Sequence, residues 1–225
     1  MEFLQEVTVW ALPIIFAITL HEAAHGWMAD KLGDPTARML GRVTINPLRH
    51  IDPLGTIILP GLLLLTTGFA FGYAKPVPID FRNLRHPRRD MVLVAAAGPG
   101  ANLLMALVAA LLIHAVPYLP ETTGTWLAQN CVNAVIINAV LGVFNMIPVP
   151  PLDGGRVAVG LLPRALAYPL SRVEPYGMLL IFGAVFLLPM VASQAGLSFN
   201  PVFEAIQPVI SGVIRLVLML AGQGA

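Results

Sequence analysis

Two histidines and a glutamate near the N-terminus are the first residues in this sequence whose types and spacing could carry out chemistry. His21 and His25 are four residues apart, and Glu22 directly follows the first histidine. In a helix this spacing places both imidazoles on one face, one turn apart. The pattern H-E-x-x-H binds zinc through its histidines and uses its glutamate as a general base. These residues therefore predict a hydrolytic zinc site.

The motif lies at the end of an apolar run, residues 7–20, rather than in a polar loop. Polar side chains inside a membrane helix are rare and commonly functional. The alternative is that the three side chains stand at a helix end and extend to the lipid surface. Because H-E-x-x-H is a specific pattern, a zinc site inside a membrane is the preferred interpretation.

The composition indicates a protein built for lipid. Of the 225 residues, 57% are hydrophobic and 11% are charged, whereas soluble domains carry about 25% charged residues. A formal net charge of +1 argues against nucleic acid as a partner. No linker or internal repeat divides the chain, so we expect a single integral-membrane domain over residues 1–225. Glu2 and Glu6 replace the basic start of a signal peptide, which predicts a retained first helix.

Apolar segments long enough to cross a membrane recur along the chain. We expect five spans, at residues 7–29, 91–116, 126–147, 176–192 and 202–220, although the last could instead lie obliquely. Residues 53–73 are apolar but rich in glycine and proline, so they form either a sixth span or a re-entrant segment. Residues 74–80 are predicted to be extended, because Pro76 and Pro78 exclude a helix. The predicted fold is an all-α integral membrane protein with a re-entrant segment and a short β-like stretch.

The distribution of basic residues favours the re-entrant alternative. Of the 13 basic residues, four lie in 31–50, five in 75–90 and three in 155–173. If 53–73 is re-entrant, these 12 residues fall on one side of the membrane. Cytoplasmic loops carry the excess of lysine and arginine. The sequence therefore predicts a multi-pass protein of the cell membrane whose H-E-x-x-H motif lies toward the cytoplasmic side.

A catalytic zinc takes three protein ligands and leaves one position open, so a third ligand is required. The remaining histidines are His50 and His86, in basic loops, and His114, near the far end of the 91–116 helix. Asp153 follows three prolines and precedes two glycines, which suits a carboxylate turned inward toward an ion. An aspartate there could equally cap the next helix. Spacing alone leaves both readings of Asp153 open.

Three motifs in order resemble the site-2 protease family of intramembrane zinc metalloproteases. They are H-E-A-A-H at 21–25, G-P-G-A-N at 98–102 and N-M-I-P-V-P-P-L-D-G-G at 145–155. G-Y-A-K-P-V-P-I at 72–79 resembles the prokaryotic branch. The resemblance covers residues 7–173, which leaves the C-terminal helices, 174–222, outside it. This sequence has neither the PDZ nor the CBS domain that some members carry.

The resemblance implies hydrolysis of peptide bonds in membrane-spanning substrates, with one zinc ion per chain. It assigns His21, His25 and Asp153 as ligands and Glu22 as the base. It also implies that Asn102 and Asn145 line the site, where a side-chain amide could stabilise the oxyanion. The alternative for both asparagines is an interhelical hydrogen bond. The oligomeric state and the identity of the substrate do not follow from the sequence.

An extended segment next to the site could help to unwind a helical substrate. Unwound backbone in lipid needs new hydrogen-bond partners, which residues 71–79 could provide as an added strand. The alternative is a rigid proline-rich connector without substrate contact.

Two other functions are compatible with the same ligands. A metal transporter or sensor would need no base beside its ligands, so Glu22 argues against it. A catalytically silent scaffold of the same fold is disfavoured by the complete ligand set and base.

Overall fold

The computed structural model describes residues 2–58, 75–194, 196 and 200–223, and the regular structure in these ranges is entirely helical. Five helical segments in them are long and apolar enough to cross a membrane: Val7–Leu32, Pro87–Tyr118, Glu121–Asn145, Glu174–Gln194 and Pro201–Leu220. The expected all-α membrane architecture and its five spans are confirmed. No strand occurs in the described ranges, and residues 75–80 are neither helix nor strand.

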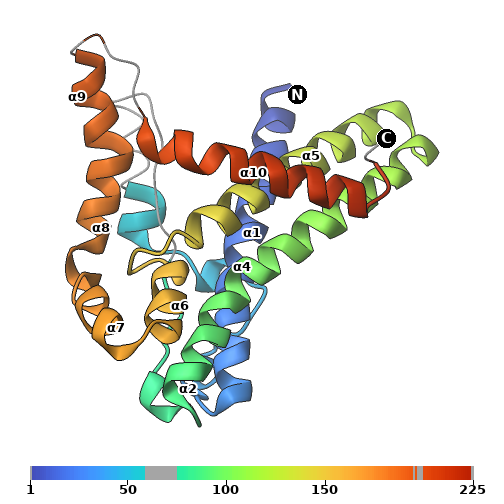
Figure 1. Ribbon diagram of the computed structural model, residues 1–225. Coiled ribbons are helices and arrows are strands. Elements are labelled where there is room, and N and C mark those ends of the chain that lie inside the picture. Colours follow the sequence, from blue (N-terminus) through green and yellow to red (C-terminus); the bar gives the residue numbers. More distant parts are fainter. Residues whose placement is uncertain (1, 59–74, 195, 197–199, 224–225) are drawn as a thin grey trace.

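Figure 1 shows the helices of the described ranges, coloured in chain order. The longer helices are α1 (Glu2–Leu32), α4 (Pro87–Leu112), α5 (Glu121–Asn145), α6 (Asp153–Leu161), α7 (Arg164–Ser171), α8 (Glu174–Phe182), α9 (Leu188–Gln194) and α10 (Pro201–Leu220). The shorter ones are α2 (Thr36–Met39), η1 (Pro47–Arg49), η2 (Pro53–Ile58), η3 (Phe81–Asn83), η4 (Ile113–Tyr118) and η5 (Gly183–Leu187).

Helices α1, α4 and α5 pack against one another and form the centre of the molecule. Their contacts use small side chains: Ala17, Ala106 and Ala139 are completely buried. Small residues let helix backbones approach closely, which is how membrane helices gain packing energy without a hydrophobic driving force. Polar side chains add hydrogen bonds between the same helices: the Asn133 amide donates to the Val9 carbonyl at 2.8 Å.

The two C-terminal spans lie at the periphery. Helix α10 crosses α5 and α4 in Figure 1 and packs on them through Val217 and through Ala221, just after its end. Helices α8 and α9 lie at the left of that view, and η5 between them contacts α10. Only 11% of each C-terminal span is buried, against 28–33% for the first three. The exposed surfaces of these helices are apolar and suit contact with lipid.

The loops that carry the basic residues meet at one end of the helix bundle. The Arg85 N–H donates to the Leu32 carbonyl at 3.1 Å, and Arg88 Nε donates to the Gly160 carbonyl at 3.0 Å. These bonds join the end of α1, residues 75–90 and α6. The Lys75 N–H donates to the His50 carbonyl at 3.0 Å, so the residues that flank the predicted re-entrant segment, 53–73, lie together. Residues 59–74 lie outside the described part, and re-entrance stays a prediction.

Candidate active site

The two motif histidines lie in the middle of the bundle, on the face of α1 that packs against α4. Both are 7% exposed, and their ring centroids are 4.6 Å apart with the rings nearly perpendicular. The two Nε2 atoms approach to 3.0 Å. The helical spacing predicted from the sequence therefore brings two nitrogen ligands to one point.

Hydrogen bonds on the far side of each ring set which nitrogen carries the proton. His21 Nδ1 lies 2.6 Å from Asn102 Oδ1, and His25 Nδ1 lies 2.7 Å from the Val94 carbonyl oxygen. Because both partners are acceptors, each Nδ1 must be the donor. Each Nε2 then presents a lone pair to the same point, which is the arrangement that a metal ligand requires.

Asn102 is held by two further contacts that decide which end of its amide faces His21. Its Nδ2 donates to Asn138 Oδ1 at 2.8 Å and to the Ala17 carbonyl at 3.3 Å, so its oxygen is left for the histidine. Asn102 is completely buried. These contacts are interhelical hydrogen bonds, the alternative role considered for Asn102. Together they form a hydrogen-bonded chain from His21 through Asn102 to Asn138. The role of Asn138 was not predicted, although an asparagine in an apolar helix was the available signal.

Asp153, at the start of α6, completes the group from the other side. Its Oδ2 lies 3.2 Å from His21 Nε2 and 3.3 Å from His25 Nε2, and the aspartate is 7% exposed. Among the described residues, His21, His25 and Asp153 form the group that could hold a metal, with ligand atoms within 4.8 Å of one another. Asp153 is not the N-cap of α6: the cap position is Leu152, and no side-chain capping bond is formed there.

Glycines allow the backbone to approach closely enough to assemble this group. A Cβ on Gly98 of α4 would lie 2.6 Å from His21 Cε1 and would also overlap His25 Nε2. A Cβ on Gly154 would lie 2.6 Å from the Ile147 carbonyl oxygen. Both glycines belong to motifs that the sequence analysis identified, and the structure shows the contacts that exclude a side chain.

The donor set fits a zinc ion. Two imidazole nitrogens and one carboxylate oxygen are a common catalytic zinc set, in which a fourth position stays open. Asp153 Oδ2 is buried and has no hydrogen-bond partner, although it faces both Nε2 atoms. Three electron-pair donors that converge without a proton between them leave a buried polar atom unsatisfied, and a cation would satisfy it.

Glu22, which follows His21 on α1, is held by a backbone N–H. Its Oε2 accepts a hydrogen bond from the Val77 N–H at 2.8 Å. Val77 belongs to the connecting segment 75–80, and a Cβ on Gly26 would meet its side chain at 3.0 Å. The segment predicted to lie near the site is therefore in direct contact with the predicted base.

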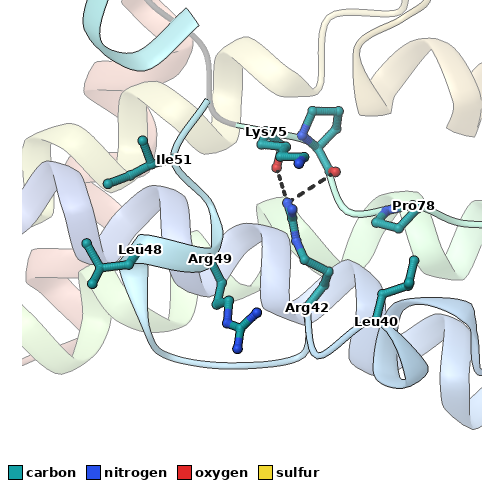
Figure 2. Close-up of a pocket in the computed structure, with 8 residues that line it drawn as sticks. Leu40, Arg42, Leu48, Arg49, Ile51, Lys75 and Pro78 are labelled. Carbon is teal, nitrogen blue, oxygen red and sulfur yellow. Dashed lines mark hydrogen bonds between the residues drawn. The ribbon is translucent and has the colours of Figure 1, made fainter. Parts of the chain in front are cut away.

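Two buried charged residues hold the 75–80 segment against α1. The guanidinium of Arg42 donates to the Lys75 carbonyl at 2.7 Å and to the Pro76 carbonyl at 3.3 Å (Figure 2). Asp34 is completely buried and accepts from the Asp80 N–H at 2.8 Å and from Asn83 Nδ2 at 3.0 Å. Its hydrogen bonds from Thr36, Asn83 and Asp80 outweigh burial and lower the pKa of the carboxyl group.

The remaining histidines are not part of the ligand group in the described structure. His50 lies in the expected basic loop, but its side chain is buried: the residue is 3% exposed and its Nε2 donates to the Thr44 carbonyl at 3.2 Å. The loop is bonded to residues 75–76 through the His50 carbonyl and the Arg42 guanidinium. His86 is an exposed residue next to Asp90, and His114 bonds to the Ala221 carbonyl.

Asn145, the other predicted lining residue, is half-buried at the end of α5. Its Nδ2 donates to the Leu141 carbonyl at 3.0 Å, one turn earlier in the same helix. This bond is local to α5 and leaves the amide oxygen for another partner. A contact of Asn145 with substrate stays a prediction.

Comparisons with known proteins point to one family. The sequence model described as peptidase family M50 matches residues 115–190. The Bacillus subtilis (strain 168) protein named "Putative zinc metalloprotease YwhC" is 38% identical over 183 residues, which cover 80% of each chain. "Putative zinc metalloprotease Rip2" of Mycolicibacterium smegmatis is 30% identical over 158 residues, or 68% of this chain and 58% of the relative. The comparison with solved structures found no match.

Proposed function

The chain belongs to peptidase family M50, and from this membership we propose that it hydrolyses peptide bonds of membrane-spanning proteins at a zinc ion. The observation that carries the proposal is the convergence of His21, His25 and Asp153 inside a bundle of membrane helices. One zinc ion per chain is proposed, held by these three residues. Residues 1–225 are proposed to act as a single domain.

When bound, zinc supplies Lewis-acid chemistry, which polarises a carbonyl group and makes water a nucleophile near neutral pH. The protein must supply the proton transfers. Glu22 adjoins His21 in the sequence, and we assign it as the general base that takes a proton from the attacking water. It then delivers that proton to the nitrogen of the leaving amine.

The hydrogen bond from Val77 supports this role for Glu22. The bond holds Oε2 in one place at 2.8 Å, so the second carboxylate oxygen is left to take the proton. The carboxylate accepts a backbone N–H and, within the described residues, forms no ion pair with a lysine or arginine. A base fixed in this way loses less entropy when the reaction begins.

The histidines act as ligands of fixed tautomer and orientation. Asn102 and the Val94 carbonyl keep each Nδ1 protonated, so each Nε2 stays available. Partners of this kind raise the basicity of the ligand and keep the ring in place.

The position of the site supports the proposed substrate class and orientation. The segments 31–50, 75–90 and 155–173 carry 12 of the 13 basic residues. Hydrogen bonds join all three near the C-terminal end of α1, which supports a cytoplasmic location for this end. A membrane-spanning segment could reach the site between the helices, and we propose the cell membrane as the location. The oligomeric state stays open.

Strand addition by residues 71–79 is retained as a proposal, with a constraint from the structure. Residues 75–80 are close to Glu22 and are not helical, as the hypothesis requires, while 71–74 lie outside the described part. The N–H groups of Lys75 and Val77 are already bonded to the His50 carbonyl and to Glu22. A substrate strand would have to replace those bonds or use other groups of the segment.

The test compares Glu22→Gln with Asp153→Ala in the purified full-length protein. We expect Glu22→Gln to keep zinc and to lose cleavage of a model transmembrane peptide, because glutamine keeps the shape without the base. Asp153→Ala should lose zinc as well as cleavage. Zinc content by mass spectrometry and peptide cleavage are measured on the same samples. Full activity in Glu22→Gln would overturn the proposal, and zinc without turnover in the wild type would favour a transporter, sensor or silent scaffold.

A further inference from the structure

A cavity among the loops that follow the first span lies next to the segment that contacts Glu22 but is separate from the ligand group. Its volume is about 460 Å³. It is bounded by the loop after α2, by η1 and the residues that follow it, and by the 75–78 segment (Figure 2). The lining residues are Leu40, Arg42, Leu48, Arg49, Ile51, Lys75, Pro76 and Pro78.

The lining is cationic and apolar, without an acidic residue. Arg42, Arg49 and Lys75 form no ion pair within the described part of the chain, whereas Arg38, Arg82 and Arg156 each have a carboxylate partner. Residues 59–74, which precede Lys75, contain no charged residue in the sequence. Three positive charges without an ion-pair partner in the described residues surround one cavity and attract an anion.

Arg42 supplies the strongest indication, because its guanidinium is buried without a carboxylate. The residue is 8% exposed, and Nη2 donates to the carbonyls of Lys75 and Pro76. Its Nε is buried and has no hydrogen-bond partner. Buried charges are normally paired, since carbonyl dipoles compensate a full charge only in part.

The surroundings indicate that the anion belongs to a lipid. Leu40 and Leu48, which line the cavity, are 58% and 72% exposed, and Met39 and Ile45 beside them are 78% and 70% exposed. The loop that carries these residues starts directly after the first span, which ends at Leu32. Apolar side chains that alternate with basic ones at the end of a span suit the boundary between acyl chains and headgroups.

We infer that this cavity binds the phosphate headgroup of an anionic membrane lipid, with Arg42, Arg49 and Lys75 around the phosphate. Leu40, Leu48 and Ile51 contact the start of the acyl chains. Arginine and lysine are the usual partners of phosphate, and basic pockets at this depth bind anionic headgroups. The bound lipid would touch Lys75 and Pro76, directly before the residue whose N–H holds Glu22.

The test titrates the full-length protein in detergent with phosphatidylglycerol or phosphatidylcholine of the same acyl chains and counts bound lipid by native mass spectrometry. Arg49→Gln combined with Lys75→Gln removes two exposed charges and leaves the buried Arg42 in place. Arg164→Gln combined with Arg172→Gln, on and just after α7, removes the same charge outside the cavity. We expect the first variant to bind phosphatidylglycerol at least about tenfold more weakly than wild type. The control should bind it as wild type does, and phosphatidylcholine should bind weakly to all three proteins.

Three outcomes would overturn the inference. Equal phosphatidylglycerol binding by wild type and the Arg49/Lys75 variant would show that the cavity is not the site. Displacement of the lipid by inorganic phosphate at equal concentration would show that free phosphate is the ligand. Tighter binding of a glutamate-rich peptide, lost in the same variant, would assign the cavity to an acidic protein segment.

Discussion

The two sides of the catalytic turn of α1 have different surroundings. On one side, His21 and His25 are buried against α4 and bonded to Asn102 and to the Val94 carbonyl. On the other side, half-buried Glu22 contacts the backbone of a connecting segment, which Arg42 and Asp34 hold in place. The ligands are therefore fixed by helix packing, whereas the base depends on a loop near the surface of the molecule.

This difference suggests that metal binding and proton transfer can be disturbed separately. Changes on the α4 side should alter zinc affinity, and activity should fall as a consequence. Changes on the side of the 75–80 segment should alter activity while zinc stays bound. The following predictions test that separation, and a result that mixes the two effects would contradict it.

The largest effect is expected from Gly98→Ala, on the ligand side. The new Cβ would lie 2.6 Å from His21 Cε1, so one or both rings must move. We expect zinc affinity to fall by about 10- to 100-fold, the range seen when ligand orientation is lost. Zinc affinity is measured by competition with a chelator.

Gly100→Ala is the matched control on the same helix, because a Cβ there meets no atom within 4 Å. It should leave zinc affinity unchanged. Equal losses in both variants would show that α4 responds to any added side chain, and the argument from close approach would fail.

Asn102→Leu should have the next largest effect. It removes the acceptor of His21 Nδ1 and leaves Asn138 without its donor. We expect zinc affinity and activity to fall together by about tenfold, as for other residues that orient metal ligands. Asn130→Ala is the control, since its amide bonds within α5 to the Trp126 carbonyl. Lost activity with unchanged zinc affinity would instead favour a direct substrate role for Asn102.

Asp34→Asn tests the 75–80 segment, which contacts the proposed base Glu22. The carboxylate accepts from Asp80 and Asn83, and the amide cannot accept at both ends. We expect a several-fold loss of peptide cleavage with zinc retained, and a loss of stability of about 1–3 kcal/mol. Cleavage rate, zinc content and thermal unfolding are measured together.

Asp30→Asn loses the same charge close by and serves as the control. Asp30 pairs with Arg38, whose side chain is 60% exposed, and the oxygen of the new amide can still accept from that guanidinium. Loss of zinc in Asp34→Asn would show that the two sides of α1 are coupled.

The smallest effect concerns pH and His50. Burial, with a further contribution from Arg42, lowers the pKa of this imidazole from its ordinary value of 6.5. The unfolded chain therefore takes up this proton more readily than the folded protein, and the free energy of unfolding should fall as the pH drops below 6.5. Thermal unfolding measured between pH 7.5 and pH 5 gives the slope of the free energy of unfolding against pH. We expect a slope of the size that one titrating group produces. His50→Gln should flatten that slope, and an unchanged slope would assign it to other groups.

Much of the architecture could be predicted because it depends on local patterns. Five apolar segments correspond to the five candidate spans, since hydrophobic length is a property of each segment alone. Asp153 could be singled out by its prolines and glycines, but spacing left a capping role equally open. Its approach to His21 depends on how α6 packs beside the end of α5, which no local pattern contains.

The sequence alone determined that His21 and His25 share a helix face, because four-residue spacing in a helix is a local geometric fact. It also determined, through resemblance, which residue types could complete the site. The tertiary structure decided the rest: the amide orientation of Asn102, the chain to Asn138, and the Val77 N–H on Glu22. These contacts join residues as far as 81 positions apart, and their geometry exists only once the helices have packed.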